Sequence, residues 1–239
     1  MKKIVILTTE TIHHAFFVKE LSSSFGEISV YCEKSKGNLF PFKTSHPFEI
    51  RRDEFELNKW FFGKKISIAD IALVKSFDSL NSPQAIEALS KEEAVVVIAF
   101  GVGRLGKEII NLFPGKIFNL HGGDPALYRG LDSHLWAIYH HDFSSLVTTL
   151  HRLDLELDTG NIVMQGDIKI SRGMAIESLR SVNTELCITM ALTLIDCASK
   201  LREVPSRKLL HLGRYYSAMP TELKEICVGR FEQYSQQVV

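Results

Sequence analysis

The sequence predicts an α/β protein built on a doubly wound, mostly parallel, Rossmann-like sheet. Two observations predict it. Short apolar runs alternate with segments of helical period, and several of these runs are apolar at consecutive rather than alternate positions. Consecutive apolar residues are typical of parallel strands that helices cover on both faces. Repeated strand–helix–strand units imply right-handed crossovers and therefore a doubly wound sheet.

Strands and helices are expected to alternate through the first half of the chain. The expected strands are 2–8, 28–32, 68–76, 94–100 and 116–121. The expected helices are roughly 12–24, 82–90 and 104–112. Ser82 and Pro83 suit the N-cap and the first turn of the second helix.

The second half is expected to add a helix from Asp132, two paired strands at 145–154 and 161–170, and a long helix at about 175–201. In the long helix, apolar residues recur every three or four positions, which indicates one buried face. Residues 37–65 do not fit this pattern. They are dense in aromatic and charged side chains, so they could form a lid, a ligand wall or, by default, a well-packed surface insertion.

The composition restricts the class of protein. The 239 residues allow one large domain, or one domain with a small appendage, and the 28 basic and 28 acidic side chains cancel. A nucleic-acid binder usually carries a net basic charge, so we expect no nucleic-acid partner. The four cysteines form no C-x-x-C pair, and no apolar run reaches the length of a signal core or a membrane span. We therefore expect a cytoplasmic protein with reduced thiols and no membrane partner.

Asn119 and His121 stand where an apolar strand ends in a Gly-Gly-Asp-Pro turn. Because strand side chains alternate, these two residues share one face. Open α/β sheets bind ligands beyond the carboxyl ends of their strands, and the glycines let backbone approach a ligand. Two interpretations are equally favoured from this stretch alone: a reaction centre, or an amide and an imidazole that cap loop carbonyls.

Asp158 supplies a carboxylate in a later Asp-Thr-Gly turn. If the loop returns to the strand end, this carboxylate would raise the pKa of His121 and fix the orientation of its ring. An amide, an imidazole and a carboxylate together suit acyl transfer to an amine, because donors stabilise an oxyanion while a base takes the amine proton. The alternative is an ordinary turn aspartate.

Two other kinds of site are disfavoured. The histidines at 134, 140, 141 and 151 lack a recognised metal-ligand spacing, and adjacent helix residues point to different faces, so no metal is expected. Residues 100–106 lack the full G-x-G-x-x-G arrangement and follow the fourth expected strand, which disfavours a dinucleotide site.

Residues 100–130, FGVGRLGKEIINLFPGKIFNLHGGDPALYRG, together with Leu-Asp-Thr-Gly at 157–160, resemble the folate-dependent formyltransferases. That family includes methionyl-tRNA formyltransferase, glycinamide ribonucleotide transformylase and the sugar N-formyltransferases of surface polysaccharides. The resemblance implies the formyltransferase fold, with a catalytic domain at 1–203 and a C-terminal extension at 204–239. Because 213–217 resembles the tail of the sugar enzymes, the extension is expected to be a hairpin that forms a homodimer.

The resemblance also implies a reaction and its residues. A formyl group would pass from N10-formyltetrahydrofolate to an amine. Asn119 and His121 would bind the developing oxyanion, while Asp158 would keep His121 oriented and charged. The pterin would lie between the end of the fourth strand and the loop of Asp158, largely on backbone groups. The residues implied there are Ala99, Phe100, Gly101, Arg104, Leu105, Leu153, Asp154 and Leu157.

Three features of the resemblance favour a nucleotide-linked 4-amino-4,6-dideoxy sugar, dTDP-linked, as the acceptor. Residues 8–16 lack the glycine-rich phosphate loop of the purine enzymes. The C-terminal tail is short and the chain has no net charge, whereas the tRNA enzymes carry a large basic C-terminal domain. The turn Gly122-Gly123-Asp124-Pro125 matches the sugar enzymes. The candidate substrate residues are Lys75, Gly122, Gly123, Tyr128, Trp136 and His13. Lys75 could equally be a surface lysine, and the two aromatic residues are more often core. The alternatives are a methionyl-tRNA formyltransferase-like enzyme without the C-terminal domain, and a non-catalytic folate- or nucleotide-binding protein.

Overall fold

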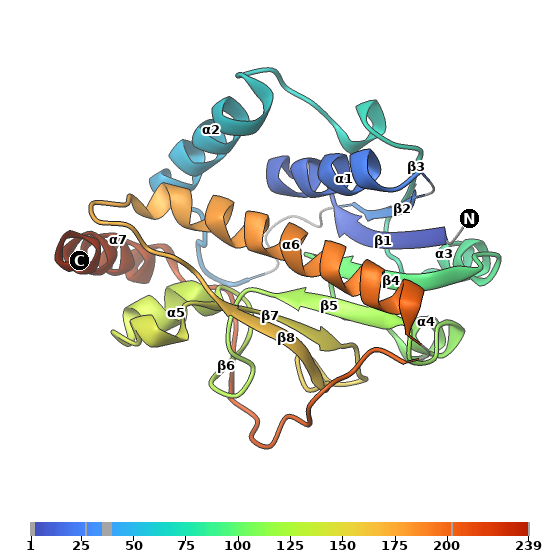
Figure 1. Ribbon diagram of the computed structural model, residues 1–239. Coiled ribbons are helices and arrows are strands. Elements are labelled where there is room, and N and C mark those ends of the chain that lie inside the picture. Colours follow the sequence, from blue (N-terminus) through green and yellow to red (C-terminus); the bar gives the residue numbers. More distant parts are fainter. Residues whose placement is uncertain (1–2, 27, 35–39, 202, 239) are drawn as a thin grey trace.

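A seven-stranded sheet forms the centre of the computed structural model, which describes residues 3–26, 28–34, 40–201 and 203–238 (Figure 1). In spatial order its strands are β3 (Val74–Phe77), β2 (Ile28–Glu33), β1 (Lys3–Thr9), β4 (Ala94–Phe100), β5 (Ile117–His121), β7 (Val147–Arg152) and β8 (Ile162–Asp167). The first five run parallel, and β7 and β8 are antiparallel to their neighbours. The mostly parallel, doubly wound sheet predicted from the sequence is therefore confirmed.

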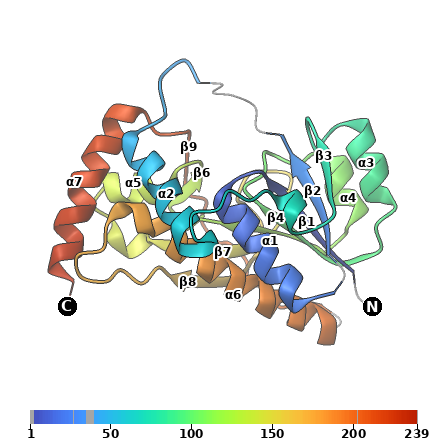
Figure 2. The same cartoon turned by 90° about the horizontal axis from the view of Figure 1, so that it is seen from above.

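Helices cover both faces of the sheet (Figures 1 and 2). They are α1 (Ile12–Ser24), α2 (Pro47–Phe61), α3 (Pro83–Ser90), α4 (Lys107–Leu112), α5 (Ser133–Tyr139), α6 (Leu179–Lys200) and α7 (Thr221–Gln237). Alternate residues of one strand enter opposite cores: Ile4 and Ile6 of β1 pack with α1 and α6, whereas Val5 and Leu7 pack with α3 and α4. This two-sided burial explains why the strands are apolar at consecutive positions.

Two expected elements are shorter in the structure. The strand expected at 68–76 exists only as β3, and residues 68–70 form a 3₁₀ turn. The Asp70 carboxylate accepts bonds from the Ser67 amide and hydroxyl, both at 2.8 Å, and so closes the turn. The helix expected at 104–112 begins at Lys107, because the Asn81 side chain binds the Gly106 amide at 2.6 Å and the Arg104 carbonyl at 2.8 Å.

The segment 37–65, which the structure describes from residue 40 onward, contains the helix α2. A capping box starts the helix: the His46 ring accepts a bond from the Phe48 amide at 3.2 Å, and Glu49 accepts one from the His46 amide at 2.8 Å. The sequence analysis assigned no helix here, because the segment has many charges and its apolar residues are mostly aromatic.

The C-terminal extension differs from the expected hairpin. Strand β9 (Arg214–Tyr216) pairs in parallel with β6 (Tyr128–Gly130) of the main domain, and α7 packs on α5. Cys227 and Phe231 of α7 are fully buried in a core shared with Phe48 and Leu135. The tail therefore packs on the main domain through a parallel strand and a helix, and it does not form the expected hairpin.

One stretch of the described residues, Ile176–Lys200, is long and apolar enough to cross a membrane. It comprises a 3₁₀ turn and α6, and α6 packs against α1, β4 and β7. Two residues of this helix, Cys187 and Leu194, are fully buried in the core that it forms with these elements. The apolar character of this helix therefore follows from its place in the core.

Candidate active site

Asn119, His121 and Asp158 meet at the carboxyl end of β5. The first two lie on that strand, and the loop between β7 and β8 returns Asp158 to them. One Asp158 oxygen, Oδ1, is 3.4 Å from Asn119 Nδ2 and 3.6 Å from His121 Nδ1. Both His121 and Asp158 are almost fully buried. The structure therefore brings together the three residues that the sequence singled out.

Backbone geometry holds the Asp158 carboxylate in place. Its second oxygen, Oδ2, accepts a hydrogen bond of 2.9 Å from the Gly130 amide, and Asp158 itself has a left-handed φ of 56°. Burial alone would raise the pKa of Asp158, but His121, His151 and the Gly130 amide hold that pKa at about 2. Asp158 is therefore ionised over the whole range in which a histidine titrates.

His121 has one ring nitrogen occupied and one facing the carboxylate. Its Nε2 lies 3.0 Å from the Tyr128 carbonyl oxygen, which can only accept a bond, so Nε2 donates a proton. Burial lowers the pKa of His121 below its ordinary value even though Asp158 acts to raise it. Asp158 therefore acts on this pKa in the expected direction, but burial outweighs it, so the expectation that His121 is kept charged is wrong. The ring is neutral at neutral pH, and Nδ1 is the atom that can take up a proton beside Asp158.

His151 joins the cluster from β7, where it lies opposite Asn119 in the antiparallel register. Its Nδ1 lies 2.8 Å from the Arg152 carbonyl, and its Nε2 lies 3.1 Å from Asn119 Nδ2 and 3.4 Å from Asp158 Oδ1. The sequence analysis considered His151 only as a metal ligand. Within the described residues no group of three metal-ligating side chains forms. The sequence feature that could have pointed to His151 is its position on the strand that leads into the Asp158 loop.

A cavity of about 420 Å³, called the slot here, opens on one side of these residues. Its walls come from 101–105 after β4 and from 153–158, so the two segments expected to flank a pterin do face each other. The expected residues that line it are Gly101, Arg104, Leu105, Leu153, Asp154 and Leu157. Ala99 and Phe100 do not line it. Ala99 is fully buried in β4, and the Phe100 ring packs on Phe17 of α1 at a centroid distance of 5.0 Å.

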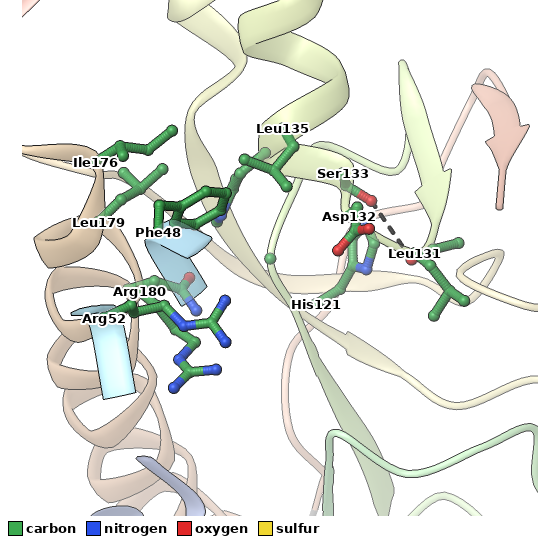
Figure 3. Close-up of a pocket in the computed structure, with 14 residues that line it drawn as sticks. Phe48, Arg52, His121, Leu131, Asp132, Ser133, Leu135, Ile176, Leu179 and Arg180 are labelled. Carbon is green, nitrogen blue, oxygen red and sulfur yellow. Dashed lines mark hydrogen bonds between the residues drawn. The ribbon is translucent and has the colours of Figure 1, made fainter. Parts of the chain in front are cut away.

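A second cavity of about 250 Å³, called the helix cavity here, opens on the other side (Figure 3). It is lined by Phe48 and Arg52 of α2, by Leu179 and Arg180 at the start of α6, and by Ser133 of α5, among others. The lining shared by both cavities is His121, Gly122, Gly130 and Leu131. His121 therefore stands in the wall between two cavities.

Residues 48–186, more than half of the chain, match the family of proteins described as formyl transferase. The chain belongs to the formyl transferase family. The resemblance predicted from its motifs is confirmed, and the match includes α2 from Phe48 onward, the strands β5 and β7, and all the residues that line the helix cavity.

Similar proteins agree on this family and differ in acceptor. A methionyl-tRNA formyltransferase of Halothermothrix orenii is 33% identical over 117 residues, 46% of this chain and 36% of that protein. The structure of WlaRD, a sugar 3N-formyltransferase with dTDP and 5-N-formyl-THF, is 18% identical with a TM-score of 0.61, over 91% and 70% of the two chains. The phosphoribosylglycinamide formyltransferase of Streptococcus pneumoniae is 14% identical with a TM-score of 0.58, over 84% and 100%. The fold is common to all of these structures.

In this family member, the expected substrate residues lie in different places. Gly122 lines both cavities, but a Cβ on Gly123 would be only 2.7 Å from Ser133 Cβ, so Gly123 serves close packing. The Tyr128 hydroxyl donates to Asp142 at 3.1 Å, and the Trp136 ring stacks on Tyr216 at a centroid distance of 4.9 Å. Neither aromatic side chain lines the slot or the helix cavity.

Lys75 and His13 also lie outside the lining of the two cavities. Lys75 Nζ binds the Tyr31 hydroxyl at 3.0 Å and Glu92 at 3.3 Å. Glu92 immediately precedes β4, so it lies at the amino end of that strand, whereas the site lies at the carboxyl ends of the strands. His13 starts α1 and packs edge-on against Phe100. The arginines that line the helix cavity are Arg52 and Arg180, and neither was among the expected substrate residues. Arg52 and Phe48 make part of segment 37–65 a cavity wall, one of the three alternatives considered for it.

Proposed function

We propose that the protein transfers a formyl group from N10-formyltetrahydrofolate to the amine of a nucleotide-linked amino sugar. The observation that carries the proposal is the position of His121, which separates the slot from the helix cavity and faces Asp158. A donor and an acceptor bound in different cavities would meet at this wall. Holding two reactants at one point is a large part of catalysis in group transfer.

The slot fits a folate in shape and chemistry. Leu105, Leu153 and Leu157 give it apolar walls, and Gly101 and Gly103 present backbone on the side after β4. A flat ring with polar edges is suited to such walls, because backbone groups can bind the edges while side chains pack on the faces. N10-formyltetrahydrofolate, when bound, supplies the formyl carbon. The chain's own groups supply orientation and proton transfer.

The residues of the cluster divide the work of transfer. Asn119 Nδ2 donates toward the formyl oxygen as negative charge develops on it. His121 Nδ1, neutral at the start, accepts the proton that the amine loses as its nitrogen bonds to the formyl carbon. Asp158 stabilises the imidazolium so formed, and His121 then returns the proton to the nitrogen that leaves the formyl carbon. The 3.6 Å between His121 Nδ1 and Asp158 Oδ1 is longer than a hydrogen bond, and catalytic contacts of this kind commonly tighten only in the substrate complex.

The amino-sugar acceptor rests on the Gly-Gly-Asp-Pro turn at 122–125 and on the chain's neutral charge. A second candidate, formylation of methionyl-tRNA, is favoured by the 33% identity to a methionyl-tRNA formyltransferase. That match covers 36% of the relative's length, so much of the relative has no counterpart in it. Binding to tRNA that weakens steeply with salt would favour the second candidate.

The test is incubation with N10-formyltetrahydrofolate and a panel of acceptors, read by mass spectrometry. The panel contains dTDP- and UDP-linked amino sugars, glycinamide ribonucleotide and methionyl-tRNA. We expect one formyl group to be added to a nucleotide-linked amino sugar and nothing to be added to the other acceptors. Formylation of tRNA alone would replace the acceptor, and folate binding without transfer to any amine would support a non-catalytic binding protein.

A further inference from the structure

Two guanidinium groups enter the helix cavity from the side opposite His121. Arg52 extends from α2 and Arg180 from the start of α6, and both point into the cavity (Figure 3). Each side chain is largely buried, with 17% of Arg52 and 22% of Arg180 exposed. Charges are rarely buried in pairs of the same sign unless acidic groups or a ligand balance them.

Acidic residues hold both groups from behind. Arg180 Nε and Nη2 bind the fully buried Glu56, and Arg180 Nη2 also binds Asp53 at 2.6 Å. Arg52 Nε and Nη2 share the same Asp53 oxygen at 3.2 Å. These bonds engage one edge of each guanidinium and fix its plane.

The remaining nitrogen of each group, Nη1, makes no hydrogen bond to any residue in the part of the chain that the structure describes. Glu49 lies 3.6 Å from Arg52 Nη1, which is an ion-pair contact beyond hydrogen-bond length. Two oriented donors, one on each helix, therefore remain for a ligand in the cavity.

The charges of the two arginines are balanced by the carboxylates behind them. Burial alone would lower the pKa of Arg180, but Glu56 and Asp53 raise it above its ordinary value. Burial lowers the pKa of Arg52, and the charge of Arg180 lowers it further. His13 and His14, at the start of α1, have a pKa lowered mainly by burial, with the charge of Arg180 among the further causes. Asp132, the carboxylate in the lining, is already bound by the Met219 amide at 2.8 Å. An anion in the cavity would therefore be bound by directed hydrogen bonds from the two Nη1 groups rather than by an excess of positive charge.

We propose that Arg52 and Arg180 form an anion subsite that binds the phosphate groups of the acceptor and so places its amine at His121. The subsite deepens the proposed function and rests on it for the identity of the acceptor. In a nucleotide-linked sugar, the diphosphate is the group of matching chemistry, because two guanidinium donors on different helices suit a ligand with several anionic oxygens. Both arginines are positioning residues, since they lie across the cavity from the reacting atoms.

The test compares Arg52→Gln with Arg51→Gln, a matched control one residue away on α2. Arg51 is 53% exposed, pairs with Glu177 and does not line the cavity. Titration calorimetry measures the binding of dTDP and of inorganic pyrophosphate, and steady-state kinetics measure KM and kcat for the amino sugar. We expect Arg52→Gln to weaken both ligands by about ten- to a hundredfold and to raise KM more than it lowers kcat, as for loss of a charge-assisted bond. The control should stay within twofold of the wild type.

A second variant, Arg180→Lys, keeps the charge beside buried Glu56 but loses the fork, so it is expected to fold and still to bind dTDP less tightly. Equal dTDP and pyrophosphate affinities in wild type, Arg52→Gln and Arg51→Gln would overturn the subsite, as would a wild type that binds neither ligand. The two proposals fail separately. Arginine-dependent dTDP binding without formyl transfer would leave the subsite standing and remove the proposed function. Formyl transfer with an unchanged KM in Arg52→Gln would remove only the subsite.

Discussion

The two cavities on either side of His121 are built in different ways. The slot is formed mainly by short loops that follow β4 and β7, so most of its residues lie in the segments 100–130 and 153–158. The helix cavity is assembled from α2, α5 and α6, which are far apart in sequence. Under the proposed function, the strand ends would supply the residues of formyl transfer and the helices would select the acceptor.

The largest effect is expected at the wall that the cavities share. The double variant Asn119→Ala with His121→Ala removes an oxyanion donor and the base together, so kcat should fall by at least about 10³-fold. Tetrahydrofolate binding, measured by calorimetry, should persist because the leucine walls of the slot remain. Substantial formylation by this variant would show that the reaction takes place elsewhere.

The next effect concerns the proton at His121. Asp158→Asn should lower kcat by about 10²-fold, because the imidazolium loses its carboxylate partner. Since Asp158 raises and burial lowers the pKa of His121, the wild-type activity should fall on the acid side below pH 6.5, as the ring becomes protonated before it can act as a base. In Asp158→Asn this acid limb should move to lower pH. A pH–rate profile that moves to higher pH would contradict the assigned direction.

A smaller and more selective effect is expected from the tail. Lys224 of α7 is 4% exposed and binds Glu49 of α2 at 3.0 Å. Removing one partner of a buried pair is costly, so Lys224→Met should lower the melting temperature by about 5 °C or more. By displacing α2 it should also raise KM for the acceptor about tenfold and leave the KM for folate unchanged.

The matched control for the tail is Glu225→Gln. Glu225 is 75% exposed and binds His46 at the start of the same helix α2 at 2.7 Å. Its loss should change both KM values by less than twofold, because an exposed ion pair contributes little. Parallel changes of both KM values in Lys224→Met would show that the cavities are not independent.

The smallest effect is expected at Lys75. This lysine is half exposed and pairs with Glu92 away from both cavities. Lys75→Ala should cost at most about 1 kcal/mol in the free energy of unfolding, measured with denaturant, and should leave both KM values unchanged. A rise in the KM for the acceptor alone would show that Lys75 belongs to the substrate site.

The features that the sequence could predict lie mainly at the strand ends. Asn119 and His121 were recognisable because a period of two along one strand places them on one face, and Asp158 because its turn belongs to a family motif. The strands β4 and β5 were predicted within a residue, since two-sided burial leaves a continuous apolar run. These features are local, so a single stretch of sequence contains them.

The features that were missed depend on distant contacts. His151 meets Asn119 only through the antiparallel register of β5 and β7. Arg52 reaches the helix cavity because α7 anchors the start of α2, where the Thr221 hydroxyl binds the Ser45 carbonyl at 2.9 Å. The tail forms β9 and α7 rather than a hairpin, because it buries Phe231 against the main domain. No pattern within any one of these segments specifies its partner.

The most direct test of two cavities meeting at His121 is a crystal structure of the protein with tetrahydrofolate and dTDP bound together. We expect the pterin between residues 101–105 and 153–158, the diphosphate in the helix cavity beside Arg52, and the His121 ring between the two ligands. Both ligands in one cavity, or a pterin outside the slot, would contradict it.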